Sequence, residues 1–188
     1  MATRDLTAIA LFAALTAVCA QASVVLPALS SVPVTLQVFA VLASGAVLGA
    51  RRGFLSQVVY LLLGAAGFPV FARGHGGAQW LVGPTGGYLW AFPIAALVAG
   101  WGWELWPGAG AGRVRFRILG AFAGLLCIYA LGVAGLVATG TVPTLARAIR
   151  VGVIPFLLLD LMKAALAAVI ADRVRSAVPV LRAAHDRS

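Results

Sequence analysis

Charged side chains are scarce in this sequence of 188 residues: Asp, Glu, Lys and Arg make up 10% of it, and only five residues are acidic. A soluble domain carries roughly 25% charged residues, because its surface faces water. The shortage excludes an ordinary cytosolic enzyme and a disordered chain. Cysteine and histidine are also rare, with two of each. Cys19 and Cys127 lie inside apolar runs, without the spacing of a disulfide framework or a metal site, so we predict no metal and no cofactor.

Apolar residues, in contrast, are abundant, at 62% of the chain with a mean hydropathy of +1.03. These values indicate a polytopic membrane protein surrounded by the lipid bilayer. In a soluble protein the net charge of +9 would suggest nucleic-acid binding. Here the basic residues form short clusters between apolar runs, as expected of residues that orient membrane spans. We therefore predict no nucleic-acid partner.

The apolar runs are long enough to predict membrane spans. A bilayer core of roughly 30 Å requires about 20 apolar residues per helix. Six runs approach this length, at residues 6–26, 36–50, 54–71, 87–106, 116–138 and 151–171. They predict an all-α membrane protein in which residues 1–188 form a single integral membrane domain, with six transmembrane helices in one compact bundle. Arg51, Arg52 and Gly53 are expected to join the second and third helices in a tight hairpin, and residues 172–188 to form a basic cytoplasmic tail.

The distribution of arginines predicts the orientation of these spans. With the N-terminus inside, ten arginines fall on the inner side and three, Arg73, Arg147 and Arg150, on the outer side. Cytoplasmic loops carry the excess of basic residues, so we expect both termini to be cytoplasmic, in a bacterial-type plasma membrane. Residues 1–23 also resemble a signal peptide. Because Asp5 interrupts its basic region, we favour an uncleaved first helix.

Asp160 and Lys163 are ionisable residues near the middle of the sixth run. Such residues cost several kcal/mol within a bilayer and are a functional-site hypothesis by default. Their i,i+3 spacing places both on one helix face, which we expect to point into the bundle because the flanking residues are apolar. Three interpretations are open: a ligand-binding pair, which we favour, a buried pair that only joins helices, and a proton relay.

A glycine-rich segment on the outer side, between the third and fourth runs, combines adaptable backbone with hydrogen-bonding and aromatic side chains. Irregular backbone at membrane depth is tolerated where it is buried in protein or lines a cavity. The candidate ligand-binding residues of this segment are Gln79, Trp80, Thr85, Tyr88 and Trp90. Its three aromatic residues also fit an interfacial aromatic belt, and we expect His75 of the same loop to be solvated.

The loop between the first two runs holds two further candidates, Thr35 and Gln37, after Pro33. They offer neutral hydrogen-bonding groups at the mouth of the bundle, and we interpret this loop as a flap over an outward-facing pocket. Thr35 has an alternative role as a cap of the second helix.

Catalysis has little support in the sequence, because no serine or cysteine lies beside a base and no metal-ligand cluster exists. The chain lacks an ATP-binding motif, so any use of ATP belongs to a partner. The first run offers a surface for such a partner, since two small-xxx-small patterns permit close approach of helices. The same patterns suit packing within the chain; they consist of Ala10, Ala13, Ala14 and Ala17.

Together these features suit a small amphipathic acid with an uncharged polar head. Two motifs are fairly specific in combination: Gly83-Pro-Thr-Gly-Gly-Tyr88 and Asp160-Leu-Met-Lys163. With Val32-Pro-Val-Thr-Leu-Gln37 and Leu63-Gly-Ala-Ala-Gly-Phe-Pro-Val-Phe71, they span essentially the whole chain. On these motifs the chain resembles the biotin-specific S components of energy-coupling factor vitamin transporters, the BioY family.

The resemblance implies a transport subunit, not an enzyme, that captures biotin from outside. The family works with a separate transmembrane coupling subunit and a pair of cytoplasmic ABC-type ATPases. Small-residue motifs on the first helix dock the coupling subunit in the family, which matches the four alanines named above.

Biotin also fits the candidate residues. Lys163 is the intramembrane cation for its carboxylate, with Arg73 or an arginine near the loop between the fifth and sixth runs as the alternative. Asp160 and Gln79 suit its ureido ring. The aromatic candidates would cover the fused rings, while Thr35 and Gln37 belong to the occluding loop.

The chain departs from the family pattern at two places. Leu158-Leu159 precede the aspartate, where the family often has Pro-Gly, and Gln79 stands where an Asn is expected. A different class of function, a self-sufficient secondary transporter with Asp160 as its proton carrier, is the alternative. A purely structural membrane protein is a third.

Overall fold

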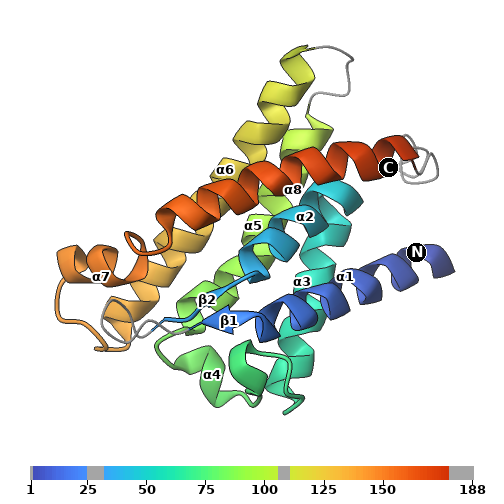
Figure 1. Cartoon of the computed structure of the whole chain (residues 1–188). Coiled ribbons are helices and arrows are strands. Elements are labelled where there is room, and N and C mark those ends of the chain that lie inside the picture. Colours follow the sequence, from blue (N-terminus) through green and yellow to red (C-terminus); the bar gives the residue numbers. More distant parts are fainter. Residues whose placement is uncertain (1, 25–31, 106–110, 178–188) are drawn as a thin grey trace.

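The computed structural model describes residues 2–24, 32–105 and 111–177. In the last of these ranges, side chains are described from residue 115 onward. The described residues are mostly helical. Figure 1 shows the elements in chain order. The long helices are α1 (Thr3–Gln21), α2 (Gln37–Leu48), α3 (Ala50–Ala65), α5 (Gly86–Glu104), α6 (Ala111–Ala138) and α8 (Leu157–Ala177). The short elements are β1 (Ser23–Val24), β2 (Val34–Thr35), the 3-10 turn η1 (Ala72–Gly74), α4 (Gln79–Val82) and α7 (Leu145–Gly152).

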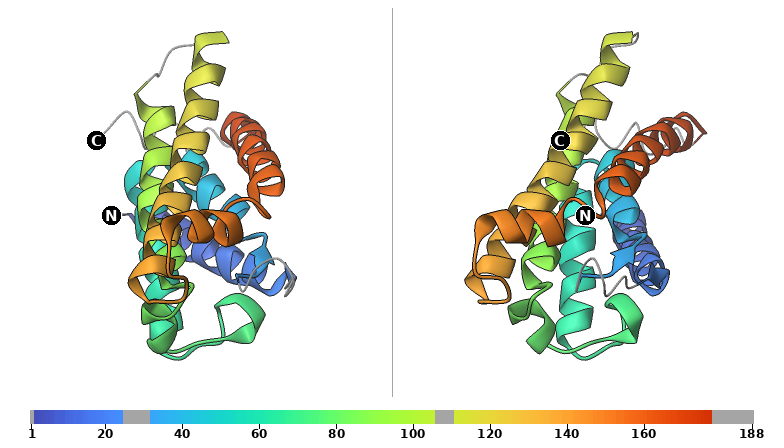
Figure 2. Two further views of the ribbon diagram at one scale, coloured as in Figure 1. Left: turned by 90° about the vertical axis from the view of Figure 1, so that its left-hand side faces the viewer. Right: turned by 60° about the vertical axis from the view of Figure 1, so that its left-hand side comes forward.

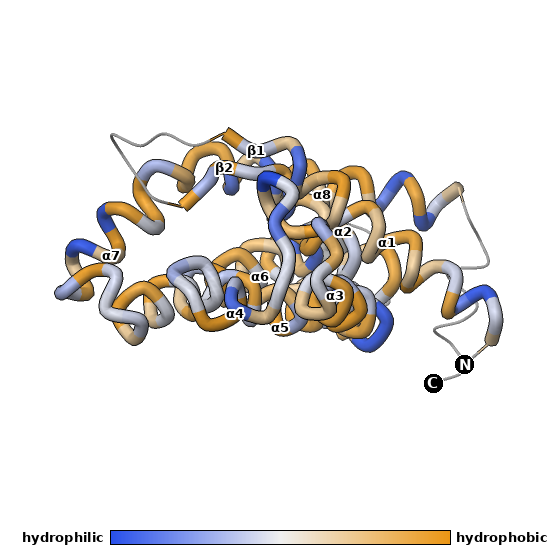
Figure 3. Tube along the Cα trace, turned by 90° about the horizontal axis from the view of Figure 1, so that it is seen from below, coloured by the Kyte–Doolittle hydropathy of each residue, from blue (hydrophilic) through white to orange (hydrophobic). Residues whose placement is uncertain are grey.

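The helices form one bundle around α5, which packs against α6, α2 and α3. Helix α8 crosses α2 and α6, and α1 lies along α2 and α3 (Figures 1 and 2). The two-residue strands pair antiparallel, Ser23 with Thr35 and Val24 with Val34. Seen from the end that carries α4, the tube is mostly hydrophobic along α5 and α6, and hydrophilic residues stand out on α7 (Figure 3).

Small residues let the helix backbones of the bundle approach closely. A Cβ built on Gly45 of α2 would overlap the backbone carbonyl of Ala96 on α5. On Gly102 of α5 it would lie 2.7 Å from the Cα of Gly120 on α6. Such contacts are typical of membrane helices, where lipid provides no hydrophobic driving force and tight van der Waals packing holds helices together.

The turn between α2 and α3 differs from the predicted connector. The two helices are separated by Gly49 alone, whose φ is +88°. Glycine adopts this conformation without the strain that a side chain would bring. The N–H of Ala50 at the start of α3 donates to Glu104 Oε1 at 2.6 Å, which satisfies one of the free donors of this helix end. Arg51 and Arg52 therefore lie in the first turn of α3, and the expectation that they form the connector was wrong.

The sixth predicted span is a bent pair of helices. Helices α7 and α8 meet at 61° across a break that contains Pro155. The N–H of Phe156 donates to the carbonyl of Val153, as in a turn. Helix α8 then continues to Ala177, so the start of the predicted basic tail is helical, and residues 178–188 lie outside the described residues.

By length and composition, two helical segments in the described part of the chain can cross a membrane, Thr3–Gln21 and Arg115–Ala138, or three if the bent α7–α8 pair counts as one span. Helix α2 is apolar but has only 12 residues. Helix α5 has 19 residues with Pro93 inside it. The coarse expectation of an all-helical membrane architecture is met by this fold, apart from the two-residue strands.

Candidate ligand-binding site

A cavity of about 190 Å³ lies between the strand pair, η1, α4, α5, α6 and the break between α7 and α8. Its wall is largely aromatic. Such a wall gives a ligand a large apolar contact area, and a few polar groups fix its orientation. The rings that line the cavity are Phe71, Trp80, Tyr88, Phe92, Tyr129 and Phe156.

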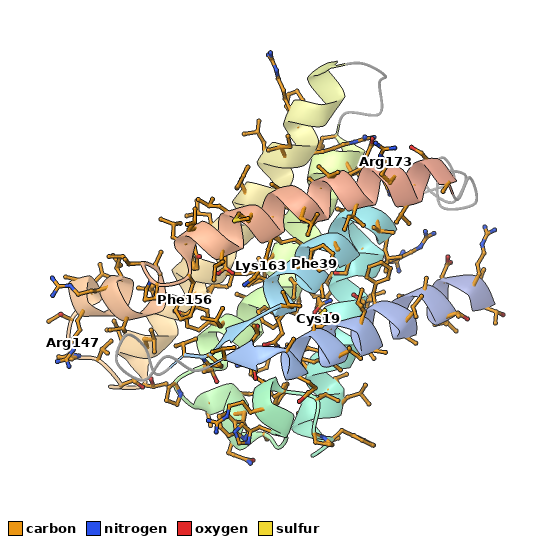
Figure 4. All side chains as sticks on the ribbon, in the orientation of Figure 1. Cys19, Phe39, Arg147, Phe156, Lys163 and Arg173 are labelled. Carbon is orange, nitrogen blue, oxygen red and sulfur yellow. The ribbon has the colours of Figure 1, made fainter. Side chains whose placement is uncertain are left out.

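Asp160 is the charged group in the wall formed by α8, and it is buried with 4% of its surface exposed. The Lys163 ammonium donates to its Oδ1 at 2.7 Å, and the Tyr129 hydroxyl donates to its Oδ2 at 2.9 Å. Both carboxylate oxygens therefore have a partner, as burial of a charge requires. The expectation that this helix face points into the bundle is met, and Figure 4 shows Lys163 on α8 above the strand pair.

Lys163 also connects α8 to the loop before α2. Its ammonium donates to the backbone carbonyl of Thr35 at 2.7 Å. The Thr35 hydroxyl in turn accepts the N–H of Gln37, the first residue of α2, at 3.1 Å. Thr35 stands one residue before the N-cap Leu36, so its hydroxyl satisfies the first N–H of α2 from outside the cap position, and it also lines the cavity. Its role in a flap stays a prediction. Gln37 lines the cavity too, and its amide donates to the Tyr60 hydroxyl at 2.7 Å.

Tyr88 holds the bend between α7 and α8. Its hydroxyl donates to the carbonyl of Gly152 at 2.8 Å, and a Cβ on Gly152 would overlap that hydroxyl. Both residues line the cavity. The glycine is required by this close approach, and the hydrogen bond satisfies a carbonyl left free where α7 ends.

The loop around η1 forms the remaining wall. Arg73 lines the cavity with a φ of +64°, which is unusual for a residue with a side chain. His75 stacks on Trp80 with ring centroids 4.0 Å apart and planes 19° apart. His75 is half-buried and lines the cavity beside Trp80, so its solvation stays a prediction.

Three predicted residues do not line the cavity: Lys163, Gln79 and Trp90. Lys163 contacts two residues that do line it, Asp160 and Thr35. The Gln79 amide is exposed and donates to the carbonyl of Gly76 at 3.0 Å, within its own loop. Trp90 is 54% exposed, and its Nε1 donates to the carbonyl of Leu81 at 2.9 Å. Trp90 follows Tyr88 and Leu89 on a helix, so it points away from the face that those two residues present to the cavity. The other predicted residues of this segment, Trp80, Thr85 and Tyr88, line it.

Comparison with known proteins decides the family. The BioY family model matches residues 1–180. The chain belongs to the BioY family.

Named relatives agree with this assignment. A probable biotin transporter BioY of Pyrococcus horikoshii is 44% identical over 175 residues, 93% of this chain and 98% of the relative. The biotin transporter BioY of Thermotoga maritima is 45% identical over 155 residues, 78% of this chain and 83% of the relative. The biotin transporter BioY of Rhizobium etli is 36% identical over 191 residues, covering 97% and 99%.

A solved structure supports the fold. It is the crystal structure of the S-component for biotin from an ECF-type ABC transporter. It superposes with a TM-score of 0.81 at 24% identity, over 94% of this chain and 95% of the other. The architecture of this BioY chain is therefore that of an S component.

Sequence reasoning missed Tyr129 and Phe156, which line the cavity from α6 and from the break before α8. Both stand in apolar runs, where an aromatic residue looks the same whether it faces lipid or the interior. A signal existed for Phe156 in the preceding Pro155, because the residue before a proline is pushed out of the helical conformation. Leu158 and Leu159 stand where the family often has Pro-Gly before the aspartate. The break between α7 and α8 is nevertheless present in this chain.

The four alanines of α1 lie on two different faces. Ala10 and Ala14 are exposed, whereas Ala13 is 1% exposed and Ala17 packs partly buried against the core. The first pattern is thus open to a partner helix. The second belongs to packing within this BioY chain, which corrects the prediction that Ala13 and Ala17 dock a partner.

Proposed function

We propose that this chain is the substrate-binding transmembrane subunit for biotin uptake: it captures biotin from outside and delivers it across the membrane together with an energy-coupling module. The observation that carries the proposal is the cavity of this BioY-family chain. It combines aromatic rings with a buried carboxylate held by an ammonium group. An apolar bicyclic ligand with a carboxylate tail and a polar ring matches both parts of this wall.

The charged pair supports an orientation for the ligand. Two of the three ammonium N–H groups of Lys163 have acceptors, Asp160 and the Thr35 carbonyl. Lys163 does not itself line the cavity, so the biotin carboxylate would have to lie beside Asp160 to accept the third N–H, in a charge-assisted bond of the strong kind. Asp160 would then accept from a ureido N–H. Thr85 and Gln37 add neutral groups to the same wall, and the rings of Trp80, Tyr88 and Phe92 would cover the apolar part.

Arg73 is the competing partner for the ligand carboxylate, because it lines the cavity from η1. If Lys163 serves only to neutralise Asp160, the ligand would lie with its tail toward Arg73. If Lys163 binds the carboxylate, Lys163→Ala should weaken biotin binding and Arg73→Ala should not. If Arg73 binds it, the reverse is expected.

The membrane arrangement follows from the same proposal. The chain would cross a bacterial-type plasma membrane six times, with the cavity outside and both termini in the cytoplasm. Its partners would be a transmembrane coupling subunit, docked on Ala10 and Ala14 of α1, and a pair of ABC-type ATPases. Exposure of these two alanines supports that surface.

Calorimetric titration of biotin into the purified, detergent-solubilised chain tests the proposal. Wild type should bind tightly, and Lys163→Ala should lose roughly 1.5–3 kcal/mol, or about 10- to 150-fold in affinity. Arg51→Ala, which removes an exposed charge from α3, is the matched control and should leave the dissociation constant unchanged.

An unchanged dissociation constant in a folded Lys163→Ala variant, with a loss in Arg73→Ala, would assign the carboxylate to Arg73. Absence of binding to folded wild type would remove the biotin assignment. Uptake into liposomes by the chain alone, without ATPases and with steep pH dependence, would instead support the proton-coupled transporter.

A further inference from the structure

Three arginines lie at the end of the bundle that carries β1, β2, η1, α4 and α7, hereafter the cavity end. Arg73 lines the cavity, and Arg147 and Arg150 project from α7, whose last residue, Gly152, lines it too. All three are exposed. Figure 4 shows Arg147 at the outer edge of α7, away from the bundle.

No carboxylate pairs with these arginines within the described residues, where the ion pairs are Arg52–Asp5, Arg117–Asp172 and Lys163–Asp160. Asp160 is the acidic residue nearest to them, and Lys163 neutralises it at 2.7 Å. Residues 25–31 contain no Asp or Glu in the sequence.

Of the four acidic residues that remain, Asp186 lies outside the described residues, and the other three belong to the other end of the molecule. Asp5 is in the first turn of α1, Glu104 ends α5, and Asp172 is near the end of α8. All three have partners at that end: Asp5 pairs with Arg52 of α3, Glu104 accepts the N–H of Ala50, and Asp172 pairs with Arg117 of α6. Within the described part of the chain, the cavity end therefore carries three positive charges and no compensating negative charge, although both signs occur at the other end.

An uncompensated charge around a cavity with low-dielectric walls concentrates ions of the opposite sign at its mouth and raises their association rate. Arginine stays charged at every physiological pH, so this field is permanent. A ligand with an ionised carboxylate experiences it before contact, whereas the Lys163 ammonium, only 11% exposed, acts on the ligand that has already entered.

We propose that Arg73, Arg147 and Arg150 steer an anionic ligand into the cavity, so that they set its association rate while the buried pair sets its residence time. The inference rests on the proposed function, because biotin is the anion it names. It assigns to α7 a role in ligand capture that does not require contact with the bound ligand.

Stopped-flow fluorescence of the purified chain in a neutral detergent tests the proposal, with Trp80 in the cavity wall as the reporter. The probes are biotin and biotinol, in which a neutral alcohol replaces the carboxylate. The association rate of biotin should fall about tenfold between about 0.01 M and about 1 M salt, as the screening length shrinks from about 30 Å to about 3 Å. The association rate of biotinol should stay constant.

The variant Arg147→Gln/Arg150→Gln should slow biotin association at low salt by about threefold and leave its dissociation rate unchanged. Its matched control is Arg51→Gln/Arg115→Gln, which removes two exposed charges from α3 and α6 at the other end. The control should associate at the wild-type rate.

Equal salt dependence for biotin and biotinol would overturn the steering role while tight biotin binding leaves the proposed function intact. Equal slowing in the two double variants would also overturn it, since the effect would then follow from net charge alone. Failure of folded wild type to bind either probe would overturn both proposals together.

Discussion

The two ends of the bundle are built in opposite ways. At the end away from the cavity, which comprises the start of α1, the turn at Gly49, the end of α5 and the end of α8, charges are paired and elements are tied to one another. Arg117 pairs with Asp172, and Arg175 donates to the carbonyl of Val47 at 2.9 Å. At the cavity end the elements are short and the exposed arginines lack such partners.

At the end away from the cavity, hereafter the tied end, Trp103 of α5 lies between two arginines. The Arg117 guanidinium lies 3.7 Å from its ring centroid, and the Arg175 guanidinium lies 5.0 Å from it. Cation–π contacts of this kind add about 0.5–2 kcal/mol each when desolvated. Helices α5, α6 and α8 are thus joined to one another at the end opposite the cavity. The comparison predicts that stability and affinity can be changed separately.

The largest effect is expected from Gly102→Leu at the tied end. A Cβ at this position would lie 2.7 Å from the carbonyl oxygen of Phe116 and from the Cα of Gly120. Separating α5 from α6 to make room should cost about 3 kcal/mol or more. Thermal unfolding in detergent measures the loss. A variant as stable as wild type would show that the two helices are not held by this close approach.

A smaller loss is expected from Asp172→Asn, which leaves the buried guanidinium of Arg117 without its counter-charge. Because the Asp172 side chain is 47% exposed, the cost should be about 1 kcal/mol and not that of a fully buried pair. Biotin affinity should be unchanged, since the pair is far from the cavity wall. Chemical denaturation and titration of the same preparation test both statements, and lost affinity at full stability would contradict the comparison.

Tyr88→Phe is expected to act in the opposite sense, on affinity more than on stability. It removes the hydroxyl that donates to Gly152 and so frees the bend between α7 and α8. The loss of a single hydrogen bond is worth about 1 kcal/mol, or about fivefold in the dissociation constant. Titration of biotin measures it. If the variant unfolds at a lower temperature than wild type but binds biotin with the same affinity, the hydrogen bond stabilises the fold and does not contribute to the site.

The smallest effect is expected from Trp90→Phe. This ring is more than half exposed and lies outside the cavity wall. Its replacement should change affinity by less than about twofold, an amount within the range of surface substitutions. Trp80→Phe is the informative counterpart, because Trp80 lines the cavity and stacks on His75. Equal losses in the two variants would place the ligand differently from the orientation proposed above.

Much of the fold was predictable from the sequence, because hydropathy reports directly on the burial of helices in lipid. The inward face of α8 was predictable for a related reason: an ionisable pair such as Asp160 and Lys163 cannot face lipid without a large cost. The bend before α8 was harder, because Pro155 stands in an apolar run whose hydropathy continues without interruption across it.

The glycine-rich loop was predictable only in part. Loops have no periodicity, so nothing in the sequence distinguishes the residue that faces the cavity, such as Trp80, from its neighbour Gln79. The hairpin turn at Gly49 was missed because the nearby Arg51 and Arg52 look like a connector. The structure instead uses the conformational freedom of one glycine and a carboxylate from α5 to end one helix and begin the next.

The link between Lys163 and the Thr35 carbonyl has a consequence for how the cavity opens and fills. One ammonium group serves the carboxylate of α8 and the backbone of β2 at once, at 2.7 Å from each. A ligand that draws this group toward itself weakens its hold on β2, and a displacement of β2 changes the affinity for that ligand by the same factor. Under the proposed function, occupancy of the cavity and the position of β2 would therefore be thermodynamically coupled through a single side chain.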